Sequence, residues 1–298
     1  MIKYLRNHSI LADGAVFKHL RLIPESMMLI GYRVRLHNWK GLLKIKLLYK
    51  SKRLSANTTY VLVHNAYQGY YHWLLESLPR LLEAREAIPD FTLLLPDTCT
   101  AEFYNETLRL LDVNQVMHLE IGITYHVPNL ALAFSNIKMG CYELATLQCL
   151  RESLLKALPI SVLQSGASGR KLYISRKLAT RRKVLNEDEV SQALISQGFE
   201  IIYFEDYTFP KQLALCSTAE IIVGMHGAGL ANMVFQPTGA RIIELRKYDG
   251  GENIFFSELA HTLGLAYQLL YCKAQNEQDL VQDADLFVDT QALLALLT

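Results

Sequence analysis

The second half of the 298-residue sequence alternates short apolar segments with helical patterns, and this alternation limits the fold more than any other feature. Strands are predicted at 171–175, 200–204, 220–225, 241–245, 266–271 and 285–289. Helices are predicted at 186–198 with Asn186 as N-cap, at 210–219, from about Ala228, at 252–264 and at the end of the chain. Apolar strands separated by helices form a parallel sheet that helices cover on both faces. An α/β domain is therefore expected.

The first half repeats this pattern less regularly. Strands are predicted at 59–65, at 91–96 and twice within 116–134, and helices at 70–86 with an interruption at Pro79, at about 101–111 and at 142–158. The first fifty residues are expected to add a small antiparallel element. The segment 158–171 has the proline and glycine content of a linker. Because the length suits two domains of about 150 residues, we expect α/β domains at 1–165 and 166–298.

Composition and charge exclude several classes of protein. The chain is 51% hydrophobic with a net charge of +1, whereas a protein that wraps nucleic acid is usually far more basic, so no nucleic-acid partner is expected. The five cysteines are scattered and form no C-x-x-C, which argues against a disulfide framework and a zinc site. The start, MIKYLRNHSILADG, lacks the apolar core of a signal peptide, and no run approaches the roughly 18 apolar residues of a membrane span. A cytoplasmic protein is expected.

Residues 39–53, WKGLLKIKLLYKSKR, combine apolar residues with a cluster of lysines and one arginine. Lys44 and Lys46 alternate with apolar neighbours, and this period of two predicts a half-exposed strand followed by a loop. The alternative interpretation is a peripheral contact with anionic lipid at the inner face of the membrane.

The segment GMHGAGL places three glycines, Gly224, Gly227 and Gly229, between a predicted strand and a predicted helix. Glycine costs backbone entropy, so three of them in six residues indicate that bare backbone is needed here. A strand that runs through such a turn into a helix exposes backbone amides that bind anions. The spacing differs from the dinucleotide fingerprint G-x-G-x-x-G, and no P-loop is present. A simple tight connection remains the alternative.

A second feature points to the same edge of the predicted sheet. Arg176 and Lys177 follow the strand at 171–175, and the carboxyl ends of parallel strands share the edge where ligands bind. Arginine suits bidentate contact with phosphate. Seven of the fourteen residues from Arg170 to Lys183 are basic. A solvated or RNA-contacting loop is the alternative, but the near-neutral net charge and the absence of interleaved aromatics argue against RNA. The two features together predict a phosphorylated ligand.

Three segments in this order resemble the signatures of glycosyltransferase family 61, including its bacterial capsular-polysaccharide members: YYHWLLESLPRLLEA, KLYISRKLATRRKVLNEDEV and GMHGAGLANMVFQPTGARIIEL. The resemblance covers about residues 60–290. It implies a GT-B-like fold, with two Rossmann-like domains, an active site in the cleft between them and a nucleotide-sugar held mainly by the second. It also implies inversion at the sugar carbon without an obligatory metal or other cofactor.

The resemblance also assigns the donor site. Arg176, with Lys177 beside it, looks like the arginine that contacts the donor diphosphate. The phosphate-cradling turn corresponds to His226, Gly227, Ala228 and Gly229.

Two further donor residues follow the turn on the same resemblance. Asn232 lies one helical turn on, and Glu244 stands where GT-B enzymes often hold the ribose hydroxyls. The alternatives are that Asn232 caps or packs, and that Glu244 pairs with Arg246 or Arg241.

The first half should supply the base that removes the proton from the acceptor hydroxyl. His72 and Glu76 are four residues apart and therefore share one face of the predicted helix. The family pattern has an acid four residues after this histidine, so the resemblance favours Glu76 as base and His72 as its orienter or as an acceptor ligand. The alternative is a pair that stiffens the helix.

The leading hypothesis is an inverting, metal-independent glycosyltransferase that moves a sugar from a nucleotide-sugar to a polysaccharide or lipid-linked glycan precursor. A D-x-D sequence occurs at 283–285, but its place before the last predicted strand suits a solvated turn rather than a metal site. The rival hypotheses are a phosphate-ester or dinucleotide enzyme and a non-catalytic nucleotide- or glycan-binding protein of the same fold.

Overall fold

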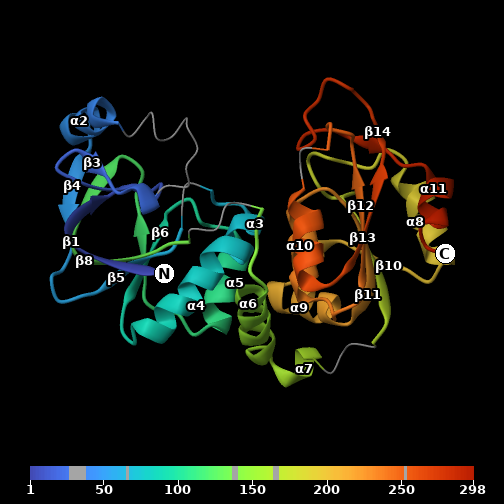
Figure 1. The fold of residues 1–298 in the computed structure, drawn as a ribbon, viewed down its shortest axis with the longest axis horizontal. Coiled ribbons are helices and arrows are strands. Elements are labelled where there is room, and N and C mark those ends of the chain that lie inside the picture. The colour runs from blue at the N-terminus through green and yellow to red at the C-terminus, as the bar shows by residue number, and fades with distance from the viewer. Residues whose placement is uncertain (27–37, 65–66, 136–139, 164–167, 252–253) are drawn as a thin grey trace. The chain divides into compact units, whose positions relative to one another are not determined.

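The computed structural model describes residues 1–26, 38–64, 67–135, 140–163, 168–251 and 254–298 (Figure 1). The chain forms two compact units, Met1–Lys138 (unit 1) and Met139–Thr298 (unit 2). Each unit has its own β-sheet and its own buried apolar cluster.

Unit 2 contains a five-stranded parallel sheet in the order β10-β9-β11-β12-β13. Its strands are β9 (Arg170–Ile174), β10 (Glu200–Ile202), β11 (Ala219–Met225), β12 (Arg241–Arg246) and β13 (Ala266–Tyr271). The helices are α6 (Leu144–Lys156), α7 (Ile160–Leu163), α8 (Glu187–Ser196), α9 (Phe209–Ser217), α10 (Phe255–Leu263) and α11 (Thr290–Ala295), with 3₁₀ turns η3 (Phe204–Asp206) and η4 (Ala228–Phe235). Figure 1 shows α9 and α10 on one side of the sheet and α8 and α11 on the other. The expected parallel α/β domain is confirmed.

One local expectation in unit 2 was wrong, and two were confirmed in part. The sixth strand, β15 (Leu286–Phe287), pairs antiparallel with β14 (Lys273–Ala274) in a separate two-stranded sheet. The helix after the glycine turn begins at Ala228 as expected, but it is the 3₁₀ helix η4. Asn186 occupies the N-cap position of α8, but its side chain makes no capping hydrogen bond, because its amide group exchanges two hydrogen bonds with the backbone of Val288, at 2.9 and 3.0 Å.

The division between the units lies before α6, whereas the sequence analysis places it at 165/166. The reason is packing: α6 buries Leu147, Leu150 and Leu154 and contacts η4 and α10. The predicted linker at 158–171 contains the short helix α7, and its residues 164–167 lie outside the described residues.

Unit 1 contains a mixed eight-stranded sheet in the order β3-β2-β1-β8-β5-β6-β7, with β4 also paired to β8. Its strands are β1 (Ile2–Ile10), β2 (Val16–Lys18), β3 (Arg21–Leu22), β4 (Lys50–Arg53), β5 (Tyr60–Leu62), β6 (Thr92–Pro96), β7 (Val116–Leu119) and β8 (Ile123–Ala133). The parallel pairs are β5 with β6, β6 with β7, and β8 with β4 and β5, whereas β1, β2 and β3 pair antiparallel. The expected antiparallel addition in the first fifty residues is confirmed.

Helical segments complete unit 1. They are the 3₁₀ turn η1 (Pro24–Ser26), α2 (Trp39–Leu48), α5 (Glu102–Leu110) and one continuous stretch of α3 (Tyr70–His72), the π-helical turn η2 (Trp73–Ser77) and α4 (Leu78–Ala87).

The strand predicted within 39–53 was wrong over most of its length, because residues 39–48 form α2. The side chain of Asn38 accepts a hydrogen bond from the Gly41 amide at 2.9 Å and so caps the helix. Leu42 and Ile45, three residues apart, pack against an apolar cluster formed by β2 and the segment between β1 and β2. The lysine–leucine alternation suggested a strand because the residues of α2 that face away from the core are also apolar. All four residues of the remainder, β4, are exposed.

Gly224 on β11 allows Leu230 of η4 to pack against the strand. A Cβ atom on Gly224 would lie 2.9 Å from Leu230 Cδ2, and Leu230 is almost fully buried. We predict that Gly224→Ala lowers the free energy of unfolding of unit 2 by about 1–3 kcal/mol through overpacking. Urea denaturation measures this. Gly229→Ala is the matched control, since its Cβ would make an ordinary 3.4 Å contact, and equal losses in both variants would contradict the packing argument.

His64, directly after β5, is buried between two carbonyl groups. Its Nδ1 lies 3.1 Å from the Leu94 oxygen and its Nε2 lies 3.2 Å from the Ala12 oxygen. Burial lowers the pKa of His64 to about 4, from 6.5 in the unfolded chain. Because the unfolded state takes up the proton first, this contribution to stability is complete above pH 6.5 and is lost as the pH falls toward 4.

We therefore predict that the wild-type protein loses about 3 kcal/mol more stability than His64→Gln between pH 7 and pH 4. Urea denaturation at several pH values gives the free energy of unfolding of both proteins as a function of pH. An equal pH dependence in the two proteins would show that His64 is not the group responsible.

Candidate functional site

The ends of β9 and β11 bring two predicted features together in unit 2. These strands are parallel neighbours, and Ile174 is in register with Gly224. Arg176 therefore follows β9 at the same edge where the glycine turn follows β11. A Cβ atom on Gly227 would lie 3.5 Å from Nη1 of Arg176. The guanidinium group thus lies against the bare backbone of the turn.

A second arginine, Arg182, reaches the same turn and was not singled out in the sequence analysis. Its Nη1 donates a hydrogen bond to the His226 carbonyl at 3.1 Å and would lie 3.3 Å from a Cβ atom on Gly227. Arg176 is fixed beside it, because its Nε and Nη2 donate to the carbonyls of Arg182 and Arg181 at 2.9 and 3.0 Å. The basic composition of residues 170–183 indicated this region, but it does not identify which of the basic side chains contact the glycine turn.

The two guanidinium groups place two positive charges side by side at the turn. Among the described residues, no acidic group lies within 4.0 Å of Arg176 or Arg182. Burial, and then the positive charges of Arg176 and Arg181, lower the pKa of Arg182 to about 10. Burial also lowers the pKa of Arg176, against the opposing effect of Glu205. A bound anion would relieve both the lost hydration and the repulsion.

The loop that carries these arginines is held by the D-x-D sequence, which the sequence analysis set aside. Asp283 pairs with Arg181 at 3.2 Å, and Asp285 Oδ1 accepts a hydrogen bond from the Lys183 amide at 2.7 Å. Arg182 has a φ of 57°, which is uncommon for a residue with a side chain. The two aspartates thus maintain the loop conformation that places Arg176 and Arg182 together.

The turn itself presents backbone donors. The His226 amide donates to Leu245 and the Leu230 amide donates to Gly227. Across the described part of the chain, the amides of Gly227, Ala228 and Gly229 have no hydrogen-bond acceptor, and Ala228 and Gly229 are half-buried. Such groups at the start of a helical turn are suited to anions.

Two predicted donor residues form buried hydrogen bonds that hold the glycine turn in place. Asn232 is fully buried, and its Nδ2 donates to the Gly229 carbonyl at 3.2 Å. Glu244 is 1% exposed and accepts hydrogen bonds from Nδ1 of His226 at 2.5 Å and from the Tyr267 hydroxyl at 2.6 Å. Since a carboxylate only accepts, the His226 proton lies on Nδ1. Arg246, the pairing partner weighed for Glu244, lies 4.0 Å from the same carboxylate.

The side chain of Lys177 pairs with an acidic residue and not with the glycine turn. Its ammonium group pairs with Asp188 at 2.8 Å on the surface, and this hydrogen bond raises the pKa of Lys177. Its backbone amide donates to Ser175, whose hydroxyl in turn donates to the buried Glu187. The segment after β9 is therefore fixed at Ser175, and the next residue, Arg176, is directed to the turn.

Unit 1 brings the predicted pair His72 and Glu76 into contact. Nδ1 of His72 lies 3.1 Å from Oε1 of Glu76, and the side chains are 19% and 12% exposed. The residues between them form the π turn η2, in which the Leu78 amide donates to Trp73. Pro79 explains this turn, because it has no amide to donate to the Leu75 carbonyl. π turns are frequent at functional sites.

Neighbouring side chains fix this pair. Trp73 donates from Nε1 to Thr107 at 2.8 Å in the core, which anchors the π turn. The ring of Tyr67 stacks on His72 with centroids 4.5 Å apart. Arg80, a residue that the sequence analysis did not single out although it lies four residues after Glu76, donates to the Val63 carbonyl at 3.0 Å. Burial lowers the pKa of Arg80, and the charge of Glu76 opposes this effect.

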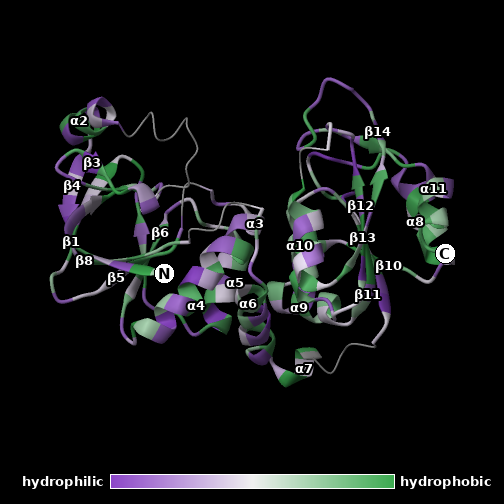
Figure 2. Cartoon of the chain, in the orientation of Figure 1, coloured by the Kyte–Doolittle hydropathy of each residue, from purple (hydrophilic) through white to green (hydrophobic). Residues whose placement is uncertain are grey.

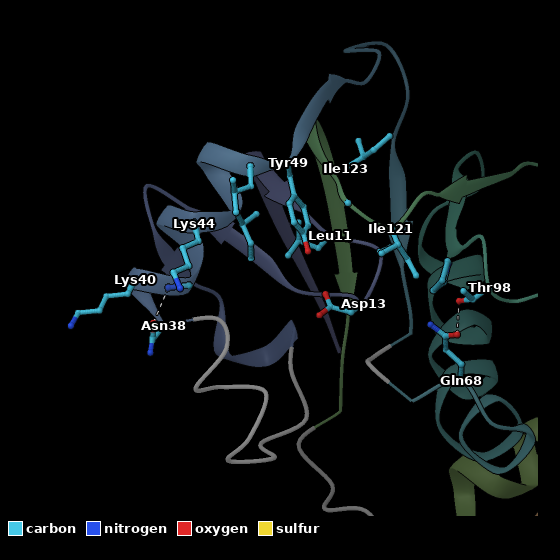
Figure 3. A pocket seen from close by; sticks show the side chains of 16 residues that line it. Leu11, Asp13, Asn38, Lys40, Lys44, Tyr49, Gln68, Thr98, Ile121 and Ile123 are labelled. Carbon is cyan, nitrogen blue, oxygen red and sulfur yellow. Dashed lines mark hydrogen bonds between the residues drawn. The ribbon is translucent and has the colours of Figure 1, made fainter.

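A cavity of about 910 Å³ lies in unit 1, between α2 and the segments that follow β5 and β6. Figure 3 shows Lys44 and Tyr49 on the α2 side, Gln68 and Thr98 on the other, and Asp13 between them. Thr98 donates to the Gln68 side chain at 2.6 Å. Gln68 follows Tyr67, so the cavity adjoins the segment that holds His72. Its volume is within the range of small-molecule sites.

No group of three or more His, Cys, Asp or Glu side chains is arranged to hold a metal ion within the described residues. No helix in the described part of the chain is both long and apolar enough to cross a bilayer.

Comparison with known proteins shows where this chain belongs. The family described as Glycosyltransferase 61 matches residues 70–243. The chain is 30% identical to the EGF domain-specific O-linked N-acetylglucosamine transferase of Drosophila melanogaster over 167 residues, 55% of this chain and 29% of the relative. It is 27% identical to the Bos taurus protein of that name over 156 residues, 50% of this chain and 27% of the relative.

A plant protein is similar over a shorter stretch. The chain is 30% identical over 139 residues to a beta-1,2-xylosyltransferase of Oryza sativa subsp. japonica, which is 44% of this chain and 24% of the relative. The matches thus span less than a third of the length of these relatives. The matched range of the family runs from α3, which carries His72, to the middle of β12 and includes Arg176, Arg182 and the glycine turn. The chain belongs to glycosyltransferase family 61.

Proposed function

We propose that this protein is a glycosyltransferase that takes its sugar from a nucleotide-sugar. The observation that carries the proposal is the pair of guanidinium groups, Arg176 and Arg182, that lie against Gly227 without a carboxylate partner among the described residues. A nucleotide-sugar supplies a diphosphate, whose oxygens match guanidinium and amide donors. Family membership supports the same activity.

Arg176, Arg182 and the turn amides would hold the diphosphate and stabilise the charge that develops on it as the sugar leaves. These fixed positive groups would do the work of a metal ion, so we propose a metal-independent reaction. A donor contact by Lys177 remains a prediction, since its ammonium pairs with Asp188 in this structure. His226, oriented by Glu244, would donate from its second ring nitrogen when protonated there. A ribose contact by Glu244 remains a prediction.

Glu76 would act as the base. An inverting transfer needs one group that removes the acceptor proton as the hydroxyl attacks. Glu76 is mostly buried, and His72 contacts its carboxylate and is itself held by Tyr67. The acceptor is assigned to the cavity beside this segment, which offers hydroxyl, amide and carboxylate groups for a sugar. The proposal includes a GT-B-like arrangement in which donor and acceptor meet.

The finer identity of the substrates is also proposed. The acceptor is a growing polysaccharide or a lipid-linked glycan precursor, of the kind used for capsular polysaccharide. The activities named for the relatives make N-acetylglucosamine and xylose the first sugars to test. The second candidate function, a non-catalytic nucleotide- or glycan-binding protein, would retain the arginine pair but would not need Glu76.

The donor site is tested by calorimetry with UDP. We predict that Arg176→Ala and Arg182→Ala each weaken binding by roughly 10- to 100-fold, because each removes a charge-assisted contact to phosphate. Lys183→Ala is the matched control on the same loop, because its side chain is exposed and only its backbone amide contacts Asp285, and it should change affinity less than about threefold. Full affinity in the Arg176 and Arg182 variants would remove these residues from the donor site.

The base is tested by turnover with the best donor from a panel of sugar nucleotides. We predict that Glu76→Gln lowers the transfer rate by at least about 100-fold and leaves the Kd for UDP unchanged, since the variant loses the proton acceptor and not the donor site. Glu86→Gln, on the exposed side of α4, should retain the wild-type rate. Wild-type turnover in Glu76→Gln would refute the assignment. Tight UDP binding without transfer to any glycan would favour the non-catalytic function.

A further inference from the structure

We infer that α2 is a docking element that places unit 1 on an anionic lipid surface. The observation is that this helix turns an apolar stripe away from the core, between rows of lysines. The helix combines hydrophobic and hydrophilic residues along its length (Figure 2).

The packed face of α2 is narrow. Leu42 is fully buried and Ile45 is partly buried, and both pack against Leu11, Ala15 and Phe17. These contacts fix the rotation of the helix, so the direction of its other side chains follows from the helical period. Residues at 39, 43 and 47 lie on a side turned away from Leu42 and Ile45.

That side is strongly apolar and exposed. Trp39, Leu43 and Leu47 are 60%, 38% and 74% exposed, and their spacing of four residues places them in one stripe. Leu48 lies on another side of the helix, where it lines the cavity of unit 1. Exposure of three large apolar side chains to water along one helix is costly, so the stripe indicates a surface that is covered in use.

The charged side chains of α2 on both sides of the apolar stripe are all lysines. Lys46 lies on one flank of the stripe, and Lys40 and Lys44 lie on the other. Among the described residues, no acidic group lies within 4.0 Å of these three lysines. Residues 38–53 contain no Asp or Glu, and β4 continues the basic surface with Lys50.

The apolar stripe and its flanking lysines together indicate which kind of partner covers α2. A helix with Trp and Leu on one face and lysines beside it lies in the interface of an anionic bilayer, where each lysine contributes about 1 kcal/mol. Trp is favoured at the level of the lipid headgroups. A second copy of the chain fits less well, because a two-fold contact would set these lysines against their own counterparts. Charge complementarity therefore favours anionic lipid, independently of the donor site in unit 2.

The test is co-sedimentation of the full chain with vesicles. We expect binding to vesicles of mixed phosphatidylglycerol and phosphatidylcholine, and much weaker binding to phosphatidylcholine alone. Added salt should reduce the binding by screening the lysines. Equal binding to both vesicle types, or no binding to either, would overturn the inference.

Variants localise the contact. Leu43→Gln with Leu47→Gln should reduce vesicle binding at least about tenfold, whereas Ile195→Gln with Leu280→Gln, which alters two similarly exposed apolar residues of unit 2, should not change it. Wild-type vesicle binding by the α2 variant would overturn the inference.

Lys46→Gln with Lys50→Gln should reduce binding about 30-fold, and Lys156→Gln with Lys273→Gln is the control. Thermal midpoints establish that each variant is folded. Sedimentation velocity tests for self-association. If the wild-type protein forms a dimer and does not bind vesicles, and the leucine variant is monomeric, the lipid assignment is overturned in favour of self-association.

Discussion

The close approach of two guanidinium groups to the backbone of Gly227 is the contact on which the proposed donor site depends. A Cβ atom at position 227 would lie 3.3 Å from Nη1 of Arg182 and 3.5 Å from Nη1 of Arg176, so both arginines lie close against the bare backbone of the turn. Burying two like charges together is unfavourable unless an anion joins them. The two arginines lie together at the carboxyl edge of a parallel sheet, which is where α/β proteins bind ligands.

The surrounding contacts serve to keep this arrangement fixed before any ligand arrives. Asp283 and Asp285 hold the arginine loop, Asn232 holds the glycine turn, and Glu244 holds His226. In unit 1, the π turn and the stacked Tyr67 do the same for His72 and Glu76. Preorganised polar groups of this kind need little rearrangement when charge develops during a reaction, which is the main way in which proteins stabilise a leaving diphosphate.

Much of the fold could be predicted from the sequence, because the strands of unit 2 are apolar runs bounded by helical patterns. The meeting of Arg176 with the glycine turn was predictable for the same reason, because residues that follow neighbouring parallel strands lie at the same edge of the sheet. Arg182 could not be chosen from the basic run, because its inward direction depends on a backbone conformation with φ of 57°. The α2 helix was missed because its outward face is as apolar as its core face, which gives lysines and leucines the alternation of a strand. The pairing of Glu244 with Tyr267 joins two strands and has no local signal.

A crystal structure with bound nucleoside diphosphate would show whether the two arginines and the glycine turn bind phosphate. We expect the phosphate oxygens within hydrogen-bond distance of Arg176, Arg182 and the amides of Ala228 and Gly229, with the loop and turn in the conformation described above. A diphosphate bound elsewhere, with the two guanidinium groups still packed against Gly227 and in contact with no phosphate, would contradict this expectation.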